Sequence, residues 1–275
     1  MLYIRSAIYT LGLVAFSANA FEGESFQHKD WYLACDNTGT CRAAGYSDTD
    51  SLNPVAVMFT REAGPATPVT AKVYLGDESD FEPWPEQINL YIDSQDLGPI
   101  KHDILTAMQV QALLAVVTKD SLIEIGDGKS NWVLSGNGAS AVFRRMDEYQ
   151  GRQNTPFAIV AKGQSAESKV IPAAALPTLV NVGGDAIMKS LEPESALPKL
   201  LNISGNDYSD GIVSSAHKGR GLGDCWSFES WVFDGKTMVR SNDSTTGLCR
   251  GIAAGGIDPM PIWVSEVVVA QDLNK

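Results

Sequence analysis

The chain has 275 residues, of which 44% are hydrophobic and 20% are charged, and its formal net charge at pH 7 is −12. This composition is typical of a folded globular protein and excludes a disordered one. The acidic balance and the lack of a basic run argue against nucleic acid as a partner, because neutralised phosphates supply most of that affinity.

The first twenty residues predict a secretory signal peptide. Arg5 gives a positive start, an apolar run follows, and Ala18 and Ala20 stand at the −3 and −1 positions of a cleavage site before Phe21. The run is too short to span a bilayer, and no later segment approaches the roughly 20 apolar residues of a membrane helix. We therefore expect a periplasmic or secreted protein that begins at Phe21, does not insert into the membrane after cleavage, and has a net charge of −13 without Arg5.

The next part of the chain predicts strands joined by turns rich in glycine and proline. At 88–92 apolar and polar residues alternate, as they do in a half-buried strand. The expected strands are 31–35, 41–46, 55–60, 69–75, 88–92, 122–125 and 132–134.

Two helices are expected in the same part. Thr106 is a favourable N-cap for the first, which extends to Thr118, and Ser140 caps the second, which extends to about Gln150. The expected apolar face of the first helix is Met108, Leu113, Ala115 and Val116. In the second helix Val142, Phe143, Met146 and Tyr149 are expected to face inward, and Arg144, Arg145, Asp147 and Glu148 to face water.

Small, polar and proline residues without periodicity predict a linker at 161–178. The expected fold is therefore α+β, with a β-rich N-terminal domain that has two helices (21–160) and a smaller β-rich C-terminal domain (179–275). In the second domain we expect a short helix at 194–201 and strands at 225–233, 236–240 and 262–269. Asp234-Gly235 is a strong hairpin signal between the first two of these strands.

Four cysteines in an exported chain predict two disulfides. Four cysteines allow three pairings, and Cys35–Cys41 with Cys225–Cys249 is favoured because turn residues place Cys35 opposite Cys41 in a hairpin. Each domain then contains one disulfide. Zinc is the weaker alternative, since neither pair has C-x-x-C spacing and only three histidines are present.

The familiar catalytic and cofactor motifs are missing from the sequence. There is no G-x-S-x-G elbow, and the glycines at 219–223 lack the lysine and hydroxyl pair of a phosphate-binding loop. A calcium loop starting at Asn206 would need a glutamate where His217 stands. We therefore predict no catalytic, cofactor-binding or metal residue and no cofactor. Paired carboxylates for glycoside hydrolysis stay open, because their separation exists only in three dimensions.

Aromatic residues gather around the C-terminal hairpin. In a strand from Cys225, two of them share the face of Cys225 and two lie on the other face. Such a strand is either packed on both sides or exposes one row to a glycan or protein. The candidate binding residues are Trp226, Phe228, Trp231 and Phe233.

Seven short segments together resemble a known family. They are His28-Lys29-Asp30-Trp31, Ala34-Cys35-Asp36-Asn37-Thr38, Cys41-Arg42-Ala43-Ala44-Gly45-Tyr46, Thr60-Arg61-Glu62-Ala63-Gly64-Pro65, Met146-Asp147-Glu148, Gln150-Gly151-Arg152 and Thr246-Gly247-Leu248-Cys249-Arg250-Gly251. The combination resembles the secreted proteobacterial family catalogued as domain of unknown function 1176. The N-terminal half is also distantly similar to invasion-associated locus B proteins. These resemblances imply export and fold, and transfer no catalytic residue.

These observations favour an exported, non-enzymatic envelope protein that binds a protein or a cell-wall polymer. A narrower form of this hypothesis is an inhibitor of a basic hydrolase such as lysozyme, which an acidic protein would complement electrostatically. The alternative is an envelope hydrolase with a carboxylate-based site. A deep cleft with two acids, one of raised pKa, would favour the enzyme, and a flat aromatic or acidic face would favour binding.

Overall fold

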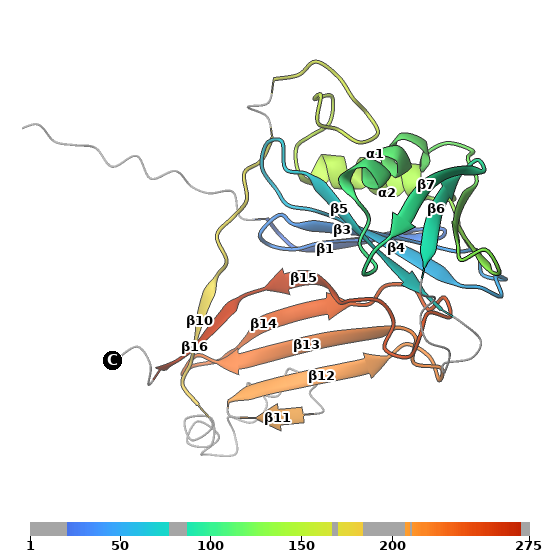
Figure 1. Cartoon of the computed structure of the whole chain (residues 1–275). Helices are drawn as coiled ribbons and strands as arrows, with labels where there is room; N and C mark the ends of the chain where they lie inside the picture. The colour runs from blue at the N-terminus through green and yellow to red at the C-terminus, as the bar shows by residue number, and fades with distance from the viewer. Residues whose placement is uncertain (1–20, 77–86, 167–169, 184–206, 210, 271–275) are drawn as a thin grey trace, which may run out of the picture.

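The computed structural model describes residues 21–76, 87–166, 170–183, 207–209 and 211–270. The expected signal peptide and the expected helix at 194–201 lie outside these residues, as do Asn206 and Asp210 of the calcium-loop segment. Within the described residues a central sheet lies between two helices on one face and a sheet of the C-terminal half on the other (Figure 1).

The central sheet is antiparallel, and its five strands follow one another in chain order. They are β1 (Glu24–His28), β2 (Trp31–Cys35), β3 (Cys41–Tyr46), β4 (Val55–Arg61) and β5 (Val69–Leu75). The four strands expected between residues 31 and 75 are confirmed, with β4 longer by Arg61, whereas β1 was not predicted.

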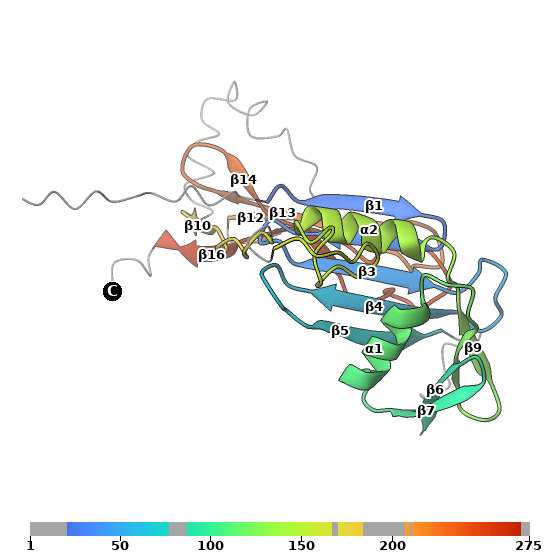
Figure 2. The ribbon, with the colours of Figure 1, turned by 90° about the horizontal axis from the view of Figure 1, so that it is seen from above.

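The helices α1 (Ala107–Val116) and α2 (Ala139–Tyr149) lie over the same face of this sheet (Figure 2). Aromatic rings join α2 to the sheet, because Phe143 lies 5.3 Å from Trp31 and 5.4 Å from Phe59 between ring centroids. All three side chains are fully buried. Burial of large aromatic rings is a main source of core stability.

The expected apolar face of α1 is partly wrong. Thr106 does cap the helix, with Gln109 completing a capping box, but Met108 is 79% exposed and Gln109 is buried. The Gln109 amide donates to the carbonyl of Gly98 at 3.0 Å, so its burial is satisfied by hydrogen bonding. Because apolar residues lie almost all around α1, its sequence has no amphipathic pattern that would indicate which face is buried.

A second antiparallel sheet packs beside α1. Its order is β7 (Gln95–Ile100), β6 (Ile88–Ile92), β8 (Ile123–Gly126) and β9 (Asn131–Leu134). The expected strands at 88–92, 122–125 and 132–134 are confirmed within one residue. β7 was not predicted, because Gly98 and Pro99 resemble a turn; as an edge strand β7 tolerates proline.

The C-terminal sheet is antiparallel and also follows chain order. Its strands are β11 (Asp207–Ser209), β12 (Ile212–Lys218), β13 (Trp226–Phe233), β14 (Met238–Thr245) and β15 (Met260–Val264). The Asp234-Gly235 turn is confirmed: the Asp234 carboxylate accepts hydrogen bonds from the backbone N–H groups of Lys236 and Thr237. The expected strand at 262–269 is divided into β15 and β16 (Glu266–Val269), and β16 pairs in parallel with β10 (Thr178–Asn181).

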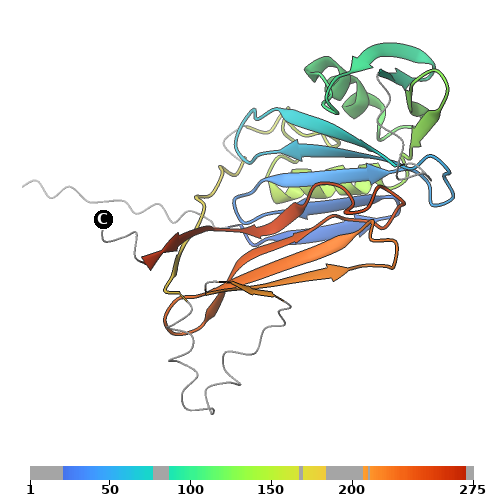
Figure 3. The same cartoon turned by 60° about the horizontal axis from the view of Figure 1, so that its bottom comes forward.

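The C-terminal half covers the second face of the central sheet through β15 and the loops before it (Figure 3). Ile252, Ile257 and Met260 are buried against alanine, methionine and tyrosine side chains of β2–β5. This cover explains why six of the seven residues of β4 are buried, since a sheet packed on both faces has no solvent-facing row.

Part of the expected linker contacts the N-terminal half. The Ile171 N–H donates to the Gln150 carbonyl at 3.1 Å, and its own carbonyl accepts from Gly64 at 3.0 Å. The boundaries of the two domains stay a prediction. The fold class is confirmed: the described part of the chain is mostly β with two helices, and each half has one disulfide. No helix in the described part of the chain is long and apolar enough to cross a membrane.

Candidate functional site

Both disulfides join the cysteines that the sequence favoured. Cys35 and Cys41 face each other across the β2–β3 hairpin with their Cα atoms 4.0 Å apart, and the Cα atoms of Cys225 and Cys249 are 4.8 Å apart. The turn between the first two is held by Asp36, whose carboxylate accepts hydrogen bonds from the Thr38 N–H and the Arg42 guanidinium.

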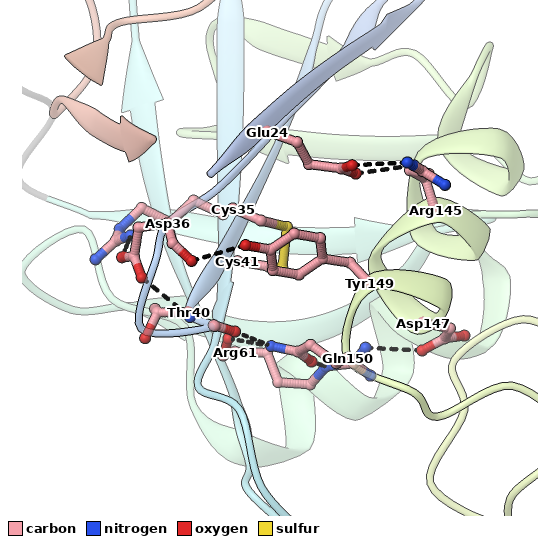
Figure 4. The surroundings of a disulfide bond; sticks show 12 residues. Glu24, Cys35, Asp36, Thr40, Cys41, Arg61, Arg145, Asp147, Tyr149 and Gln150 are labelled. Atoms are coloured by element: carbon pink, nitrogen blue, oxygen red, sulfur yellow. Dashed lines mark hydrogen bonds and ion pairs between the residues drawn. A yellow bond between two sulfur atoms is a disulfide. The ribbon is translucent and has the colours of Figure 1, made fainter. Parts of the chain in front are cut away.

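A buried polar network, formed by Arg61, Asp147 and Gln150, connects α2 to this hairpin (Figure 4). Arg61 Nη2 lies 2.7 Å from Asp147 Oδ1, and Arg61 Nε donates to Gln150 Oε1 at 2.6 Å. The Gln150 amide in turn donates to the backbone carbonyl of Gly39 at 2.7 Å. The three side chains of this network are at most 1% exposed.

The expectation that Asp147 faces water is wrong. Its second carboxylate oxygen accepts hydrogen bonds from the backbone N–H groups of Ile159 and Val160, at 2.8 and 3.1 Å. The positive charge of Arg61 and three hydrogen bonds in total compensate this carboxylate for its lost hydration. The helical pattern of α2 could not reveal this, because the partner Arg61 lies on β4, 86 residues earlier.

Arg152 lies close to this network and is 1% exposed. It donates to the carbonyls of Glu62 and Gly64 and to the Thr67 hydroxyl, all in the connection between β4 and β5. Burial, together with the nearby positive charge of Arg61, lowers the pKa of Arg152 to about 10, although the Asp147 carboxylate opposes the shift. Burial also lowers the pKa of Arg61, although Asp147 opposes the shift.

Sequence reasoning named none of these polar residues as a site. Their one signal was the resemblance, because the segments 60–65, 146–148 and 150–152 carried it and now meet in space. Segment 246–251 likewise meets the first and third segments, since Arg250 pairs with Asp30 at 2.7 Å and the Tyr46 hydroxyl donates to the Thr246 carbonyl.

The aromatic candidates of β13 divide between its two faces. Trp226 and Phe228, which we call the aromatic pair, are half-buried, and their rings are nearly parallel with centroids 6.2 Å apart. Lys218, opposite Trp226 on β12, places its ammonium 5.3 Å from the indole centroid. Trp231 is half-buried on the other face of the strand, and Phe233 is buried.

The carboxylates with a clear pKa shift in the described residues do not match the pattern that a glycosidase needs. A general acid needs a raised pKa at neutral pH. Each carboxyl group with a clear pKa shift in the described residues is shifted downward instead, namely Asp127, Asp224, Asp234 and Asp258.

Asp224, Cys225 and Cys249 form a cluster of potential metal ligands in the described part of the chain. The two sulfur atoms are bonded to each other, so neither is a thiolate ligand. The Asp224 carboxylate already accepts hydrogen bonds from Arg220 and from the Gly251 N–H. This cluster is therefore a structural disulfide with a paired carboxylate.

Comparison with known proteins gives one family. A family model described as "Protein of unknown function (DUF1176)" matches residues 25–199 and 186–265. No curated protein and no solved structure matches the chain. The similarity of the N-terminal half to invasion-associated locus B proteins has no support from these comparisons and stays a prediction.

Proposed function

The chain belongs to the DUF1176 family of unknown function, and from that premise we propose that it is an exported, non-enzymatic binding module that recognises a protein through its aromatic pair. The observation that carries this proposal is the surface around Trp226 and Phe228. Two half-buried aromatic rings lie there side by side on a sheet rather than in a closed core. The disulfides and the lack of a membrane-spanning helix in the described residues are compatible with export.

The residues beside the aromatic pair fit a protein partner better than a cell-wall polymer. The indole N–H of Trp226 donates to the Gly223 carbonyl at 2.8 Å, so the ring lies against the β12–β13 loop. That loop carries Leu222, which is 60% exposed, and Arg220. Tryptophan and arginine are enriched at the energetically dominant positions of protein interfaces, and an exposed leucine adds apolar area.

Photocrosslinking from Leu222 tests the proposal. A Leu222→p-benzoylphenylalanine variant of the mature, oxidised protein is irradiated in the envelope fraction and compared with a Met108→p-benzoylphenylalanine control. Met108 is 79% exposed and lies on α1, which covers the face of the central sheet opposite to the C-terminal half. We expect a protein adduct at position 222 that is lacking at position 108 and falls at least fivefold when Trp226→Ser and Phe228→Ser are added.

Three results would contradict this proposal. Identical adducts at both positions, or none at position 222, would show that the aromatic pair is no interface. Adducts with peptidoglycan in place of protein would exclude the protein partner and support the cell-wall form of the binding hypothesis.

The narrower form of the proposal, in which the protein inhibits a basic hydrolase, predicts inhibition that depends on salt. The net acidic charge of the chain would complement a basic hydrolase, so inhibition should be strongest at low salt. A lysozyme assay with micromolar protein at low ionic strength tests it, and full lysozyme activity under these conditions would remove this form.

A further inference from the structure

A pocket of about 540 Å³ lies between α1, the β4–β5 connection and the loop that follows α2. Its size is within the range of small-molecule sites. Three cationic residues line it, Arg61, Arg152 and Lys162, and none of the described residues that line it is acidic. Its apolar lining includes Val69, Leu114 and Phe157.

Arg152 is the buried cation of this pocket that has no ion pair of its own among the described residues, because the nearby Asp147 carboxylate, which also attracts it, is paired with Arg61. Arg61 is paired with Asp147, whereas Arg152 donates to two carbonyl groups and one hydroxyl, all of them neutral. Those bonds all start from Nη2, although a guanidinium has five N–H donors. The Nε atom of Arg152 is buried without a hydrogen-bond partner in the described part of the chain.

A buried guanidinium that shares its nearest carboxylate with a second cation is energetically costly, as is a buried donor without an acceptor. An oxyanion in the pocket would relieve both costs once the guanidinium turns toward it, because it supplies one negative charge and several acceptor lone pairs. Lys162, which is exposed, would add long-range attraction at the edge of the pocket. This positive site stands out in a chain whose net charge is −12.

We propose that this pocket binds a monocarboxylate with an apolar body, whose carboxylate accepts hydrogen bonds from Arg152. One buried cation remains unpaired, so one negative charge balances it, whereas a phosphate dianion would overcompensate. The apolar walls formed by Val69, Leu114 and Phe157 match a hydrocarbon or aromatic body rather than a small inorganic ion. The pocket lies in the N-terminal half and the aromatic pair in the C-terminal half, so failure of one proposal would leave the other unaffected.

Calorimetric titration of the mature, oxidised protein tests the carboxylate site. The probes are acetate, butanoate, octanoate and benzoate, with 1-octanol as the uncharged match of octanoate and inorganic phosphate as the other oxyanion. We expect saturable binding of octanoate or benzoate with a dissociation constant below 1 mM, and at least tenfold weaker binding of 1-octanol and phosphate. Equal affinity for 1-octanol or for phosphate would overturn the proposal, and so would no binding of any carboxylate up to 10 mM.

Variants at two exposed lining positions, Ala115 and Lys162, keep the test independent of folding, and a third variant changes the buried Arg152. Ala115→Phe fills the pocket from an exposed position of α1 and should weaken carboxylate binding at least tenfold. Lys162→Met should weaken it about threefold, while the matched control Lys101→Met, which lies outside the lining, should leave it unchanged. Arg152→Lys keeps the charge but loses the guanidinium donors, and should weaken binding about tenfold. Unchanged affinity in folded Ala115→Phe protein would place the ligand elsewhere and refute the assignment.

Discussion

Replacing Asp147 with asparagine tests whether the buried ion pair holds α2 on the central sheet. Asparagine keeps the shape of the side chain but removes the charge opposite Arg61 and replaces one of two acceptor oxygens with an NH₂ donor. Either Arg61 or the N–H groups of Ile159 and Val160 then lose their acceptor. Removing one partner of a buried ion pair costs about 3–5 kcal/mol, because the other charge stays buried.

The assay is urea and thermal unfolding of the mature, oxidised protein followed by circular dichroism. For a chain of this length about 1 kcal/mol corresponds to a Tm shift of about 2–4 °C, so we expect Asp147→Asn to lower Tm by about 6–20 °C. Glu148→Gln, the exposed neighbour with a surface ion pair to Arg145, is the matched control and should cost less than about 1 kcal/mol.

A double variant separates the ion pair from the general cost of altering a core position. Arg61→Met with Asp147→Leu removes both charges, and we expect it to lose less stability than the sum of the single variants. A loss below about 1 kcal/mol for Asp147→Asn, or strict additivity in the double variant, would refute the conclusion that the pair is coupled and buried.

Three further predictions concern the junction of the two halves and the disulfides. Tyr46→Phe should cost about 1–3 kcal/mol in unfolding assays, because the Leu248 N–H and the carbonyl of the buried Thr246 lose their partner, and an unchanged Tm would contradict this. Cys225→Ser with Cys249→Ser should cost about 3 kcal/mol by the chain-entropy model, and a thiol titration of native protein should find fewer than two free thiols. Burial acts to raise the pKa of Asp224, but hydrogen bonds from Arg220 and the Gly251 N–H outweigh it and lower this pKa below its usual value. The stability that this carboxylate contributes is therefore full only well above the unfolded-state pKa of about 3.9, and it is lost as pH falls through the folded-state pKa. Asp224→Asn should flatten the acid limb of a Tm-against-pH curve, and an unaltered limb would be evidence against this pairing.

Local signals in the sequence were enough for much of the fold. Turn residues between Cys35 and Cys41 predicted both the hairpin and its disulfide, and Asp234-Gly235 predicted the turn after β13. These signals depend on neighbours in the chain, so one sequence carries them. The strand β7 was not predicted, because a glycine and a proline in a strand are tolerated at a sheet edge, and the position of a strand in its sheet is a property of the tertiary fold.

The polar residues of the site could not be derived in the same way. A helical pattern places Asp147 beside the charged residues of α2, and only the packing of β4 against the helix supplies its partner Arg61. The burial of Arg152 likewise depends on three acceptors of the β4–β5 connection, about 90 residues away. Long-range pairing of this kind leaves no periodic trace in the sequence.

The claim that the aromatic pair is a recognition surface is tested most directly by quantitative capture from the envelope fraction. Wild-type protein and the Trp226→Ser, Phe228→Ser variant are compared, with Met108→Ser as the control, because Met108 is an equally apolar but 79% exposed residue of the other half. We predict one protein that wild type and Met108→Ser capture equally and that the aromatic variant, still folded by circular dichroism, loses at least fivefold. Equal capture by all three proteins would contradict the proposed function.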